Sequence, residues 1–569
     1  MKKLLLLVVF FGLSSTIFSQ WSTDPNINNS VSTASGNQQN VATCPDGAGG
    51  LIMTWVDVPT SKIYAQRVNA FGQAQWTTGG INISGNTGDH SMPCITSDAG
   101  GGAIIGWRDS RNGSHDVYAQ RVRVDGLLMW AAGGVRVSAV PYPNMTQLRC
   151  MGAEAGYAIF GWLNSASGLY SQKVDATGLR LWDANDLRIS FFGTNSFDMC
   201  KDAAKGVYFA YSMPDTTADG WEEDIFAQHV TLGGDTLWNI HHCINHDTLT
   251  QYRPSMCEDQ DYGFIVSWED FRHDSHSDIY AQRVDSARNK YWGSHGKAIC
   301  TTSDNQTRPY CISDAHSGAH IVWLDDRSQP AAGHGLYGQN VNHNGQTQWT
   351  NNGKRISYRV DGTVTADGRF NPQVAAVDAL GGLIACWIGY SDDGLTNYGL
   401  LAQRIDYYGS TMWSSNGVFV TTTDLVKGPS MVFDGGMSGC NVAWADGRTF
   451  GSSGYDIYAQ HIKSGSDLGN RPLSNNNNNN VSKVSTVKQN YPNPFNPVTN
   501  ISFDISTQGF VSLKIYDMTG REVAVLANGV YAPGQYSATW DASNFATGAY
   551  LYKFITNEKT EIKTMMLVK

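Results

Sequence analysis

Four copies of the pattern W-x-D-x-R pair a carboxylate with a guanidinium two residues apart. The pairs are Asp109–Arg111, Asp270–Arg272, Asp325–Arg327 and Asp446–Arg448. Both groups form hydrogen bonds with sugar hydroxyls, so a ring of such pairs could bind a polar ligand, for example a glycan. The repetition favours another interpretation, an ion pair that braces one loop in every repeat, because catalytic residues usually occur only once.

Two further arginines, Arg253 and Arg308, stand in the segments YRPSMC and TRPYC. They could point into a central channel, in the same repeats as Asp270 and Asp325. A glycosidase needs two carboxyl groups in one pocket, but the sialidase pattern S-x-D-x-G-x-T-W is absent and no catalytic residue can be named. We therefore expect a binding or adhesion protein for glycan or surface protein ligands. The alternative is a polysaccharide-active enzyme, a sialidase-like hydrolase or a lyase, that uses the central channel.

Cofactors and nucleic acid have little support in the sequence. The loops DSRNGSHD and DFRHDSHSD offer oxygen ligands for calcium, but their acidic residues lack the spacing of an EF-hand. No cysteine or histidine group has the spacing of a zinc site. We expect no metal and no cofactor, with calcium as an open alternative. The net charge of -10 gives no basic patch for nucleic acid.

Eight copies of a hexapeptide indicate which elements position these residues. It first reads IYAQRV at residues 63–68, and its glutamines are Gln66, Gln120, Gln172, Gln228, Gln282, Gln339, Gln403 and Gln460. The glutamines lie 52 to 64 residues apart, which is typical of a four-stranded β-propeller blade of the longer kind. A tryptophan follows each of the first seven glutamines ten residues later. Aromatic residues at fixed positions of this kind pack neighbouring blades together.

The last repeat lacks its tryptophan. Asn470 stands at that position, while Trp21 is left unmatched at the other end of the chain. A propeller closes when an N-terminal strand completes the last blade, since closure leaves no exposed sheet edge. We therefore predict an all-β fold: an eight-bladed propeller of four-stranded blades over residues 20–463, closed by the N-terminal strand, with Trp21 in the blade that contains Gln460.

Residues 1–19 have the three parts of a secretory signal peptide. Lys2 and Lys3 precede an apolar run from Leu4 to Leu13, and small and polar residues follow. The run is too short to span a bilayer, which needs about 20 apolar residues. Cleavage is expected near Ser19 and Gln20. The rest of the chain has no second long apolar stretch, so we expect no transmembrane segment in the mature protein.

Six of the ten cysteines recur in the repeats. Each repeat also has an aromatic residue in its expected second strand, at Trp55, Trp107, Trp162, Tyr211, Trp268 and Trp323 in the first six repeats. Cysteine precedes this second-strand aromatic by 11 to 13 residues, at Cys44, Cys94, Cys150, Cys200, Cys257 and Cys311. Ala375 or Ala376 and Val432 fill the corresponding place in later repeats, so cysteine behaves here as a small apolar residue. We expect these six thiols to be buried and reduced, with equivalent positions on adjacent blades too far apart for disulfide bonds.

The composition changes after Ile462. Residues 464–487 are rich in serine and asparagine and include six consecutive asparagines at 475–480, which indicates a flexible linker. Residues 488–569 alternate apolar and polar residues in short segments that the turns TGR, APG and ATG separate. This pattern predicts a small Ig-like β-sandwich.

The C-terminal segment also carries a set of motifs in a fixed order. They are YPNPFNP, KIYDMTGREV, GQYSATWDASNFATGAYLYKF and the terminal KTMMLVK. With them, residues 488–569 resemble the type A C-terminal sorting domain of the type IX secretion system, which is similar to the FlgD-type Ig-like fold. The resemblance implies that the type IX machinery carries the chain across the outer membrane after Sec export through the periplasm. The protein would then be extracellular or at the cell surface. The repeats resemble uncharacterised exported bacterial β-propeller proteins.

Overall fold

The computed structural model divides the chain into two compact units, Met1–Arg471 and Pro472–Lys569. It describes residues 21–568 except 154, 192, 205, 215–221, 239–241, 248, 274, 328–333, 361–372, 377–380, 392–397, 435–438, 452–453, 464, 470–484, 491, 507–508, 520, 532–533, 544 and 557–558. The predicted signal peptide, its cleavage site and the asparagine run lie outside the described residues. Within those residues the chain forms strands, turns and bends but no helix, which confirms the all-β class. No described helix is therefore long and apolar enough to cross a membrane.

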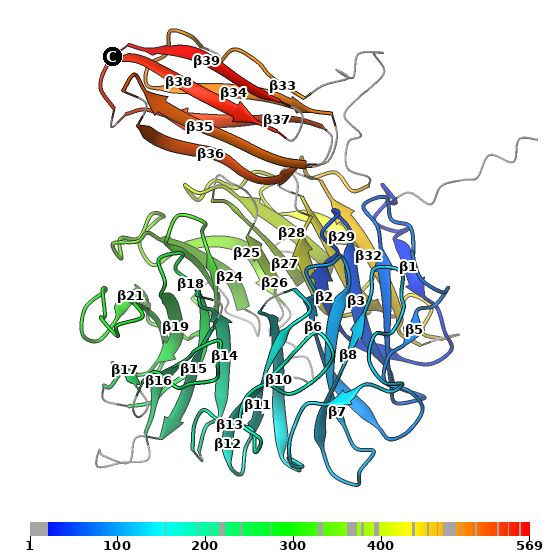
Figure 1. Ribbon diagram of the computed structural model, residues 1–569. Coiled ribbons are helices and arrows are strands. Elements are labelled where there is room, and N and C mark those ends of the chain that lie inside the picture. Colours follow the sequence, from blue (N-terminus) through cyan, green and yellow to red (C-terminus); the bar gives the residue numbers. More distant parts are fainter. Residues whose placement is uncertain are drawn as a thin grey trace, which may run out of the picture. The chain divides into compact units, whose positions relative to one another are not determined.

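Unit 1 consists of antiparallel sheets whose strands follow one another along the chain (Figure 1). The first five sheets are β2–β5 (Gln38–Pro45, Leu51–Asp57, Lys62–Val68, Ile81–Asn82), β6–β9 (His90–Ser97, Ala103–Asp109, Asp116–Val122, Val135–Arg136), β10–β13 (Met145–Gly152, Ala158–Asn164, Gly168–Val174, Leu187–Arg188), β14–β17 (Ser196–Lys201, Val207–Pro214, Glu223–Val230, His242–Asn245) and β18–β21 (Gln251–Glu258, Phe264–Asp270, Asp278–Val284, Lys297–Cys300).

The next eight strands repeat the same pattern twice. They are β22–β25 (Gln306–Ser313, Ala319–Asp325, His334–Val341, Lys354–Val360) and β26–β29 (Gln373–Ala376, Leu383–Tyr390, Tyr398–Ile405, Val418–Thr421). The two sets join into one sheet because Val360 pairs with Gly389. The last sheet combines β30 (Val426–Phe433), β31 (Cys440–Asp446) and β32 (Asp456–Ile462) with β1 (Asn29–Ser32) from the other end of the chain.

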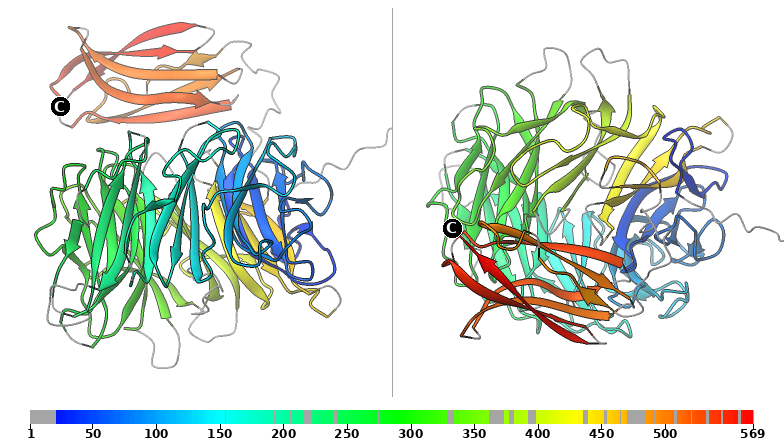
Figure 2. Two further views of the ribbon diagram at one scale, coloured as in Figure 1. Left: turned by 60° about the horizontal axis from the view of Figure 1, so that its bottom comes forward. Right: turned by 90° about the horizontal axis from the view of Figure 1, so that it is seen from above.

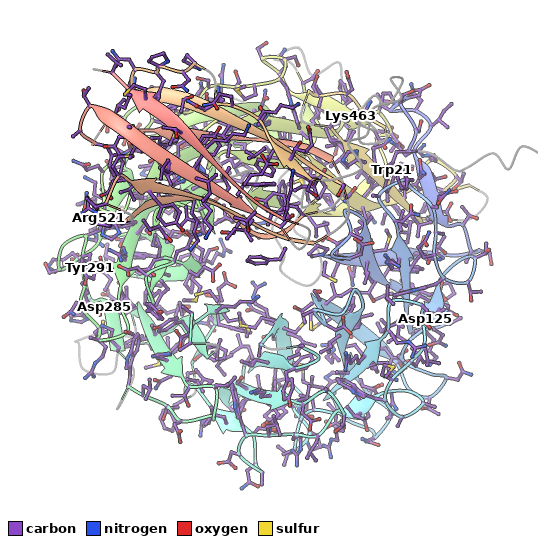
Figure 3. All side chains as sticks on the ribbon, turned by 45° about the horizontal axis from the view of Figure 1, so that its top comes forward. Trp21, Asp125, Asp285, Tyr291, Lys463 and Arg521 are labelled. Atoms are coloured by element: carbon purple, nitrogen blue, oxygen red, sulfur yellow. The ribbon has the colours of Figure 1, made fainter. Side chains whose placement is uncertain are left out.

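The sheets of unit 1 surround a central axis (Figure 3). The first strand of each sheet contacts the first strand of the next, in the order β2, β6, β10, β14, β18, β22, β26 and β30. β30 then contacts β2, so the series of contacts returns to its start. The innermost strands therefore form the wall around the axis, and residues at their ends share one central space.

The repeated glutamine and tryptophan link each sheet to the next. The side-chain oxygen of Gln66 accepts a hydrogen bond of 2.9 Å from the backbone N–H of Trp76. The indole N–H of Trp76 donates to the carbonyl of Val124, a turn residue of the following sheet, at 3.0 Å. The same link between sheets recurs at Trp130, Trp182, Trp238, Trp292 and Trp349. These tryptophans thus act as packing and linking residues.

Trp21 makes the corresponding link where the first and last segments of unit 1 meet, near Lys463 in Figure 3. Its indole N–H donates to the carbonyl of Ala70 in the first sheet at 3.0 Å, and only 2% of the residue is exposed. The strand that follows, β1, pairs with β32, and Asn29 lies opposite Ala459. The N-terminal segment therefore completes the last sheet and connects it to the first.

The strand register corrects the expected placement of the cysteines. Three of them lie opposite the residue three before the second-strand aromatic (Cys44, Cys200, Cys257), two opposite the residue two before it (Cys150, Cys311), and Cys94 opposite the residue directly before it. The six cysteines therefore occupy three different positions relative to the second strand. An equal distance along the sequence does not mean an equal place in the sheet, because the register of the first two strands differs between sheets. Successive residues of a strand face opposite sides of a sheet. Cys257 and Cys311 therefore meet between neighbouring sheets, with Sγ atoms 3.4 Å apart. Of the later residues assigned to this place, Val432 is buried, and the side chains of Ala375 and Ala376 lie outside the described part.

We expect most thiols to be inert in the folded chain. Burial raises the pKa of Cys44 and Cys257, which keeps both thiols protonated, and a protonated, buried thiol reacts slowly. A thiol reagent should label only the half-buried Cys150 and Cys243 in native buffer, and all ten cysteines in denaturant. Mass mapping without reductant identifies the labelled sites. A cross-link between Cys257 and Cys311 in that map would contradict the expected reduced state.

Unit 2 has two sheets around its own core (Figure 2). One contains β33 (Thr486–Val487), β34 (Val498–Ile505) and β37 (Gly534–Asp541); the other contains β35 (Gly509–Asp517), β36 (Glu522–Tyr531), β38 (Gly548–Ile555) and β39 (Thr560–Leu567). Phe503 and Trp540 from the first sheet pack with Leu513 and Tyr552 from the second. Residues 485–487 belong to this unit and Leu468 pairs within unit 1, so the segment between the units is shorter than the expected linker, 464–487.

Candidate functional site

A bulge near the start of five first strands places one residue of each in the left-handed backbone region. One extra residue interrupts the pairing, and the φ angles lie between 50° and 58° at Asn40, Met92, Arg253, Arg308 and Gly428. Proline follows four of the five; it has no N–H for strand pairing and therefore favours a bulge. A residue other than glycine costs about 1–3 kcal/mol in such a conformation, and strain of this size often marks functional positions. Arg253 and Arg308 carry the only charged side chains among these five residues, so they are the first candidates for ligand contact.

Glu269 brings these two arginines together. It lies in β19 opposite Tyr252 and is fully buried. Its carboxylate accepts a hydrogen bond from Nη1 of Arg253 at 3.1 Å and from the backbone N–H of Arg308 at 2.6 Å. One buried carboxylate thus fixes an arginine of its own sheet and the backbone of an arginine in the next sheet.

The charges around Glu269 determine which protonation states the site holds. Burial lowers the pKa of Arg308, and the charge of Arg253 lowers it further. Burial and the Glu269 carboxylate raise the pKa of Tyr252 to about 12, although Arg253 acts in the other direction. Tyr252 is therefore protonated at neutral pH, whereas a tyrosine acting as a base would need a lowered pKa.

Tyr252, Arg253 and Arg308 line a cavity of about 870 Å³ at the inner strands of unit 1. Cavities that bind small molecules measure about 300–1,000 Å³. Aromatic walls come from Phe197, Tyr252 and Tyr310, and charged or amide groups from Arg149, Asn195, Asp198, Glu223, Arg253 and Arg308. Asp198 is held by the backbone N–H of Met256 at 3.0 Å and by Arg149 at 3.4 Å. The cavity therefore combines flat apolar surfaces with fixed polar groups, which suits a sugar or another polar ligand.

The four predicted Asp–Arg pairs have their hydrogen-bonding groups occupied within the chain. Asp109 accepts bonds from the indole N–H of Trp107 at 2.7 Å and from Nε and Nη2 of Arg111 at 2.9 and 2.6 Å. The same bonds recur at the other three pairs, Asp270–Arg272, Asp325–Arg327 and Asp446–Arg448, and all four aspartates are fully buried. Each guanidinium also lies 3.9–4.2 Å from the centre of a third-strand tyrosine ring. This geometry is that of a loop brace.

The arginine of each brace also reaches the segment that leads into the fourth strand. Arg111 donates to the carbonyl of Gly133 at 2.8 Å, and Arg272 and Arg327 make the same contact in their sheets. In the last sheet the fourth strand comes from the N-terminal segment, and Arg448 donates to Asn26 O at 2.9 Å and Asn28 Oδ1 at 2.7 Å. The brace thus helps to attach that segment.

Replacing Asp109 by asparagine should destabilise unit 1 by about 3–5 kcal/mol, because one partner of a buried ion pair is removed. The control is Asp125→Asn. Asp125 pairs with Arg123 on the surface, where both side chains are about half exposed, and such pairs contribute little. Urea unfolding of both variants measures the difference. Equal unfolding midpoints for the two variants would contradict the brace.

The Asp109→Asn variant should also change how the stability of unit 1 depends on pH. Burial alone would raise the pKa of Asp109, but hydrogen bonds from His90, Arg111 and Trp107 outweigh it and hold this pKa below its usual range. The ionised carboxylate therefore stabilises the fold fully above the unfolded pKa, about 3.9, and this contribution is lost as the pH falls through the folded pKa. Below about pH 4 the wild type should lose stability more steeply than Asp109→Asn.

A second repeated contact, at the opposite end of the sheets, was not predicted. The residue after the repeated glutamine bonds to an aspartate in the turn between the first two strands, at 2.8–3.1 Å, in the pairs Arg67–Asp46, Arg121–Asp98, His229–Asp202, Arg283–Asp259 and His461–Asp434. The signal was present in the sequence, since a basic residue follows the glutamine in most repeats. These contacts also serve the fold. Among the described residues, no group of three His, Cys, Asp or Glu side chains could hold a metal ion.

Comparison with known proteins gives one family match. Residues 489–569 match the secretion system C-terminal sorting domain. No curated protein matches the chain.

Several solved structures resemble the chain at low scores. A family PL25 ulvan lyase bound to -[GlcA(1-4)Rha3S]- has 10% identity over 69% of this chain and 97% of its own, with a TM-score of 0.40. An α-L-arabinofuranosidase from Fusarium graminearum has 12% identity over 56% of this chain and 93% of its own, with a TM-score of 0.33. A protein of unknown function from Dyadobacter fermentans has 10% identity over 67% of this chain and 95% of its own, also at 0.33. Similarity at this level carries no argument about what the chain binds.

The family match is of a different kind, because it extends from the YPNPFNP motif to the end of the chain and implies a secreted or cell-surface protein. The C-terminal unit of this chain is a type IX secretion C-terminal sorting domain.

Proposed function

We propose that unit 1 is an eight-bladed β-propeller displayed outside the cell, and that its central cavity binds a glycan or protein ligand. The propeller spans residue 20 to about Gly469, and residues 485–569 form an Ig-like, FlgD-like sandwich, because Leu468 pairs within unit 1 and Thr486–Val487 pair within unit 2. Support comes from the closed series of first-strand contacts and from β1, which completes the last sheet.

Export begins, in this proposal, with Sec-dependent passage to the periplasm. Residues 1–19 act as a signal peptide that is cleaved near Ser19 and Gln20. The type IX machinery then recognises the sorting domain, and the propeller reaches the surface or the medium. The sorting domain supplies the support for the second step.

The cavity beside Glu269 is the observation that carries the binding function. Arg253 and Arg308 are kept in strained conformations there, and the surrounding aromatic and amide side chains suit a polar ligand. The four Asp–Arg pairs, by contrast, act as braces with few groups left for a ligand. Ligand contact is thus assigned to Arg253 and Arg308.

A polysaccharide-active enzyme is the second candidate, because Asp198 and Glu223 both line the cavity. Paired carboxyl groups are what a glycosidase requires. Asp198 is, however, engaged by Arg149 and by a backbone N–H, and Glu223 accepts a hydrogen bond from the side-chain amide of Asn195. Because both carboxylates are engaged by neighbouring groups, binding is the better-supported function.

A glycan array probed with the full-length chain tests the proposal. We expect retention on a subset of glycans and no release of reducing ends or unsaturated products when the same glycans are incubated with the chain. Product release would identify the enzyme instead. Absence of retention on every glycan, together with no product, would count against a saccharide ligand altogether.

A further inference from the structure

The guanidinium of Arg308 differs from the other arginine side chains of the cavity wall. Arg253 bonds to Glu269 at 3.1 Å, and Arg149 lies 3.4 Å from Asp198. The Arg308 side chain makes no hydrogen bond or ion pair within the described part of the chain, although its backbone N–H is held by Glu269. An arginine half-buried in a cavity without an acidic partner is uncommon, because desolvating its charge is costly.

Glu269 attracts the charge of Arg308 but forms no hydrogen bond or ion pair with its guanidinium. Its carboxylate already accepts from Arg253 Nη1 and from the Arg308 backbone. Two arginines therefore stand beside Glu269, and the guanidinium of Arg308 keeps N–H donors that no described residue accepts. The backbone bond also fixes where the Arg308 side chain begins.

The chemistry of the wall indicates what would neutralise this charge. A guanidinium binds planar or tetrahedral oxyanions through parallel N–H donors. Tyr252, Tyr310 and Phe197 add flat faces, and Asn195 adds an amide. A cavity of about 870 Å³ lined by strands has room for a few sugar rings but not for a folded domain.

We propose that Arg308, together with Arg253, binds the anionic group of an acidic saccharide, a carboxylate or a sulfate, in this cavity. The inference rests on the proposed function, that the cavity binds a ligand, and adds the chemical class of that ligand. Arg308 supplies a guanidinium that has no hydrogen-bonded partner among the described residues, Arg253 supplies the neighbouring one, and the aromatic side chains contact the sugar rings.

Three soluble probes test the inference on the full-length chain by titration calorimetry: an oligogalacturonate, a sulfated galactan oligosaccharide and a neutral xylo-oligosaccharide. We expect one of the two anionic probes to bind more tightly than the neutral one, and which of them does so identifies the anion. Arg308→Gln should weaken that probe by about 10- to 100-fold, as expected for the loss of hydrogen bonds to a charged group. Arg308→Lys keeps the charge and should retain part of the affinity. Higher salt should weaken binding to the wild type.

Arg123→Gln is the matched control, since it removes a half-exposed arginine outside the cavity wall and should leave the affinity unchanged. Thermal unfolding of each variant shows that it is folded. If all three probes bind with equal affinity and Arg308→Gln does not change that affinity, the inference is overturned while saccharide binding stands. Binding of an oligoglutamate in place of every saccharide would overturn the saccharide class. If no probe binds, the inference and a saccharide-binding function fall together.

Discussion

Removing Trp21–Ser32 should open unit 1 and lower its stability more than any single substitution in a loop. The segment supplies the fourth strand of the last sheet, and Trp21 donates the hydrogen bond that links this sheet to the first. Trp21 and Val31 also belong to a core that includes Val41 and Ala443. Loss of a buried tryptophan alone costs about 3–5 kcal/mol. The deletion further exposes the edge of β32, and an unpaired edge strand promotes association.

Thermal unfolding and size-exclusion chromatography measure both effects. The most informative control moves the segment instead of removing it. Gly469 lies next to Trp21 and Thr23, so a permuted unit 1 that begins at residue 33 and carries residues 21–32 after Gly469 should recover the stability of the original chain. Trp21→Ala should cost several kcal/mol, whereas Ile27→Ala, at a side chain 65% exposed, should cost little. A deletion variant as stable as the wild type would show that the ring does not depend on this closure.

Removing the sorting domain should leave the propeller folded and retained in the periplasm. Unit 2 has a core of its own, and unit 1 has separate cores around its sheets. Truncation after Arg471 therefore removes one unit without exposing the interior of the other. We expect cell fractionation to find the truncated chain in the periplasm and the full chain at the surface or in the medium. Efficient surface delivery of the truncated chain would rule out the transport role.

The reverse experiment fuses the domain to a periplasmic reporter, and the structure refines where the fusion should begin. Thr486 and Val487 form β33, which pairs with β34, and Ser485 contacts Ser506. A fusion that starts at Lys488 lacks this strand, whereas one that starts at Ser485 keeps it. We expect the longer fusion to resist proteolysis better and to be exported more efficiently. Equal behaviour of the two fusions would mean that β33 is dispensable for transport.

The repeats predicted the sheets well because each repeated residue has a local physical role. The glutamine bonds the segment before the fourth strand and the tryptophan bonds the next sheet, so their spacing follows directly from the architecture. The unmatched Trp21 was informative for the same reason. The cysteines were placed less well, because an offset counted along the sequence does not reveal a shift of one or two residues in register. Cys257 and Cys311 therefore approach each other unexpectedly.

The cavity could be anticipated only in part. The segments YRPSMC and TRPYC drew attention to Arg253 and Arg308, and the proline after each arginine is the local cause of the bulge. Glu269 carried no such signal: it stands between the aromatic Trp268 and the brace residue Asp270, and only the pairing of β18 with β19 brings it to Tyr252. A contact between two sheets of this kind depends on three-dimensional proximity that no short motif encodes.

The pairing of β1 with β32 also determines when the propeller can finish folding. Asn29 and Ala459 are about 430 residues apart in the chain, so the first strand must wait for almost all of unit 1 to be synthesised. The entropy of closing so long a loop grows only slowly with its length, by about 0.6 kcal/mol per doubling, yet pairings between such distant segments form late. The other sheets are built from consecutive strands and can assemble as they emerge. The N-terminal segment is thus the last element of unit 1 to be placed.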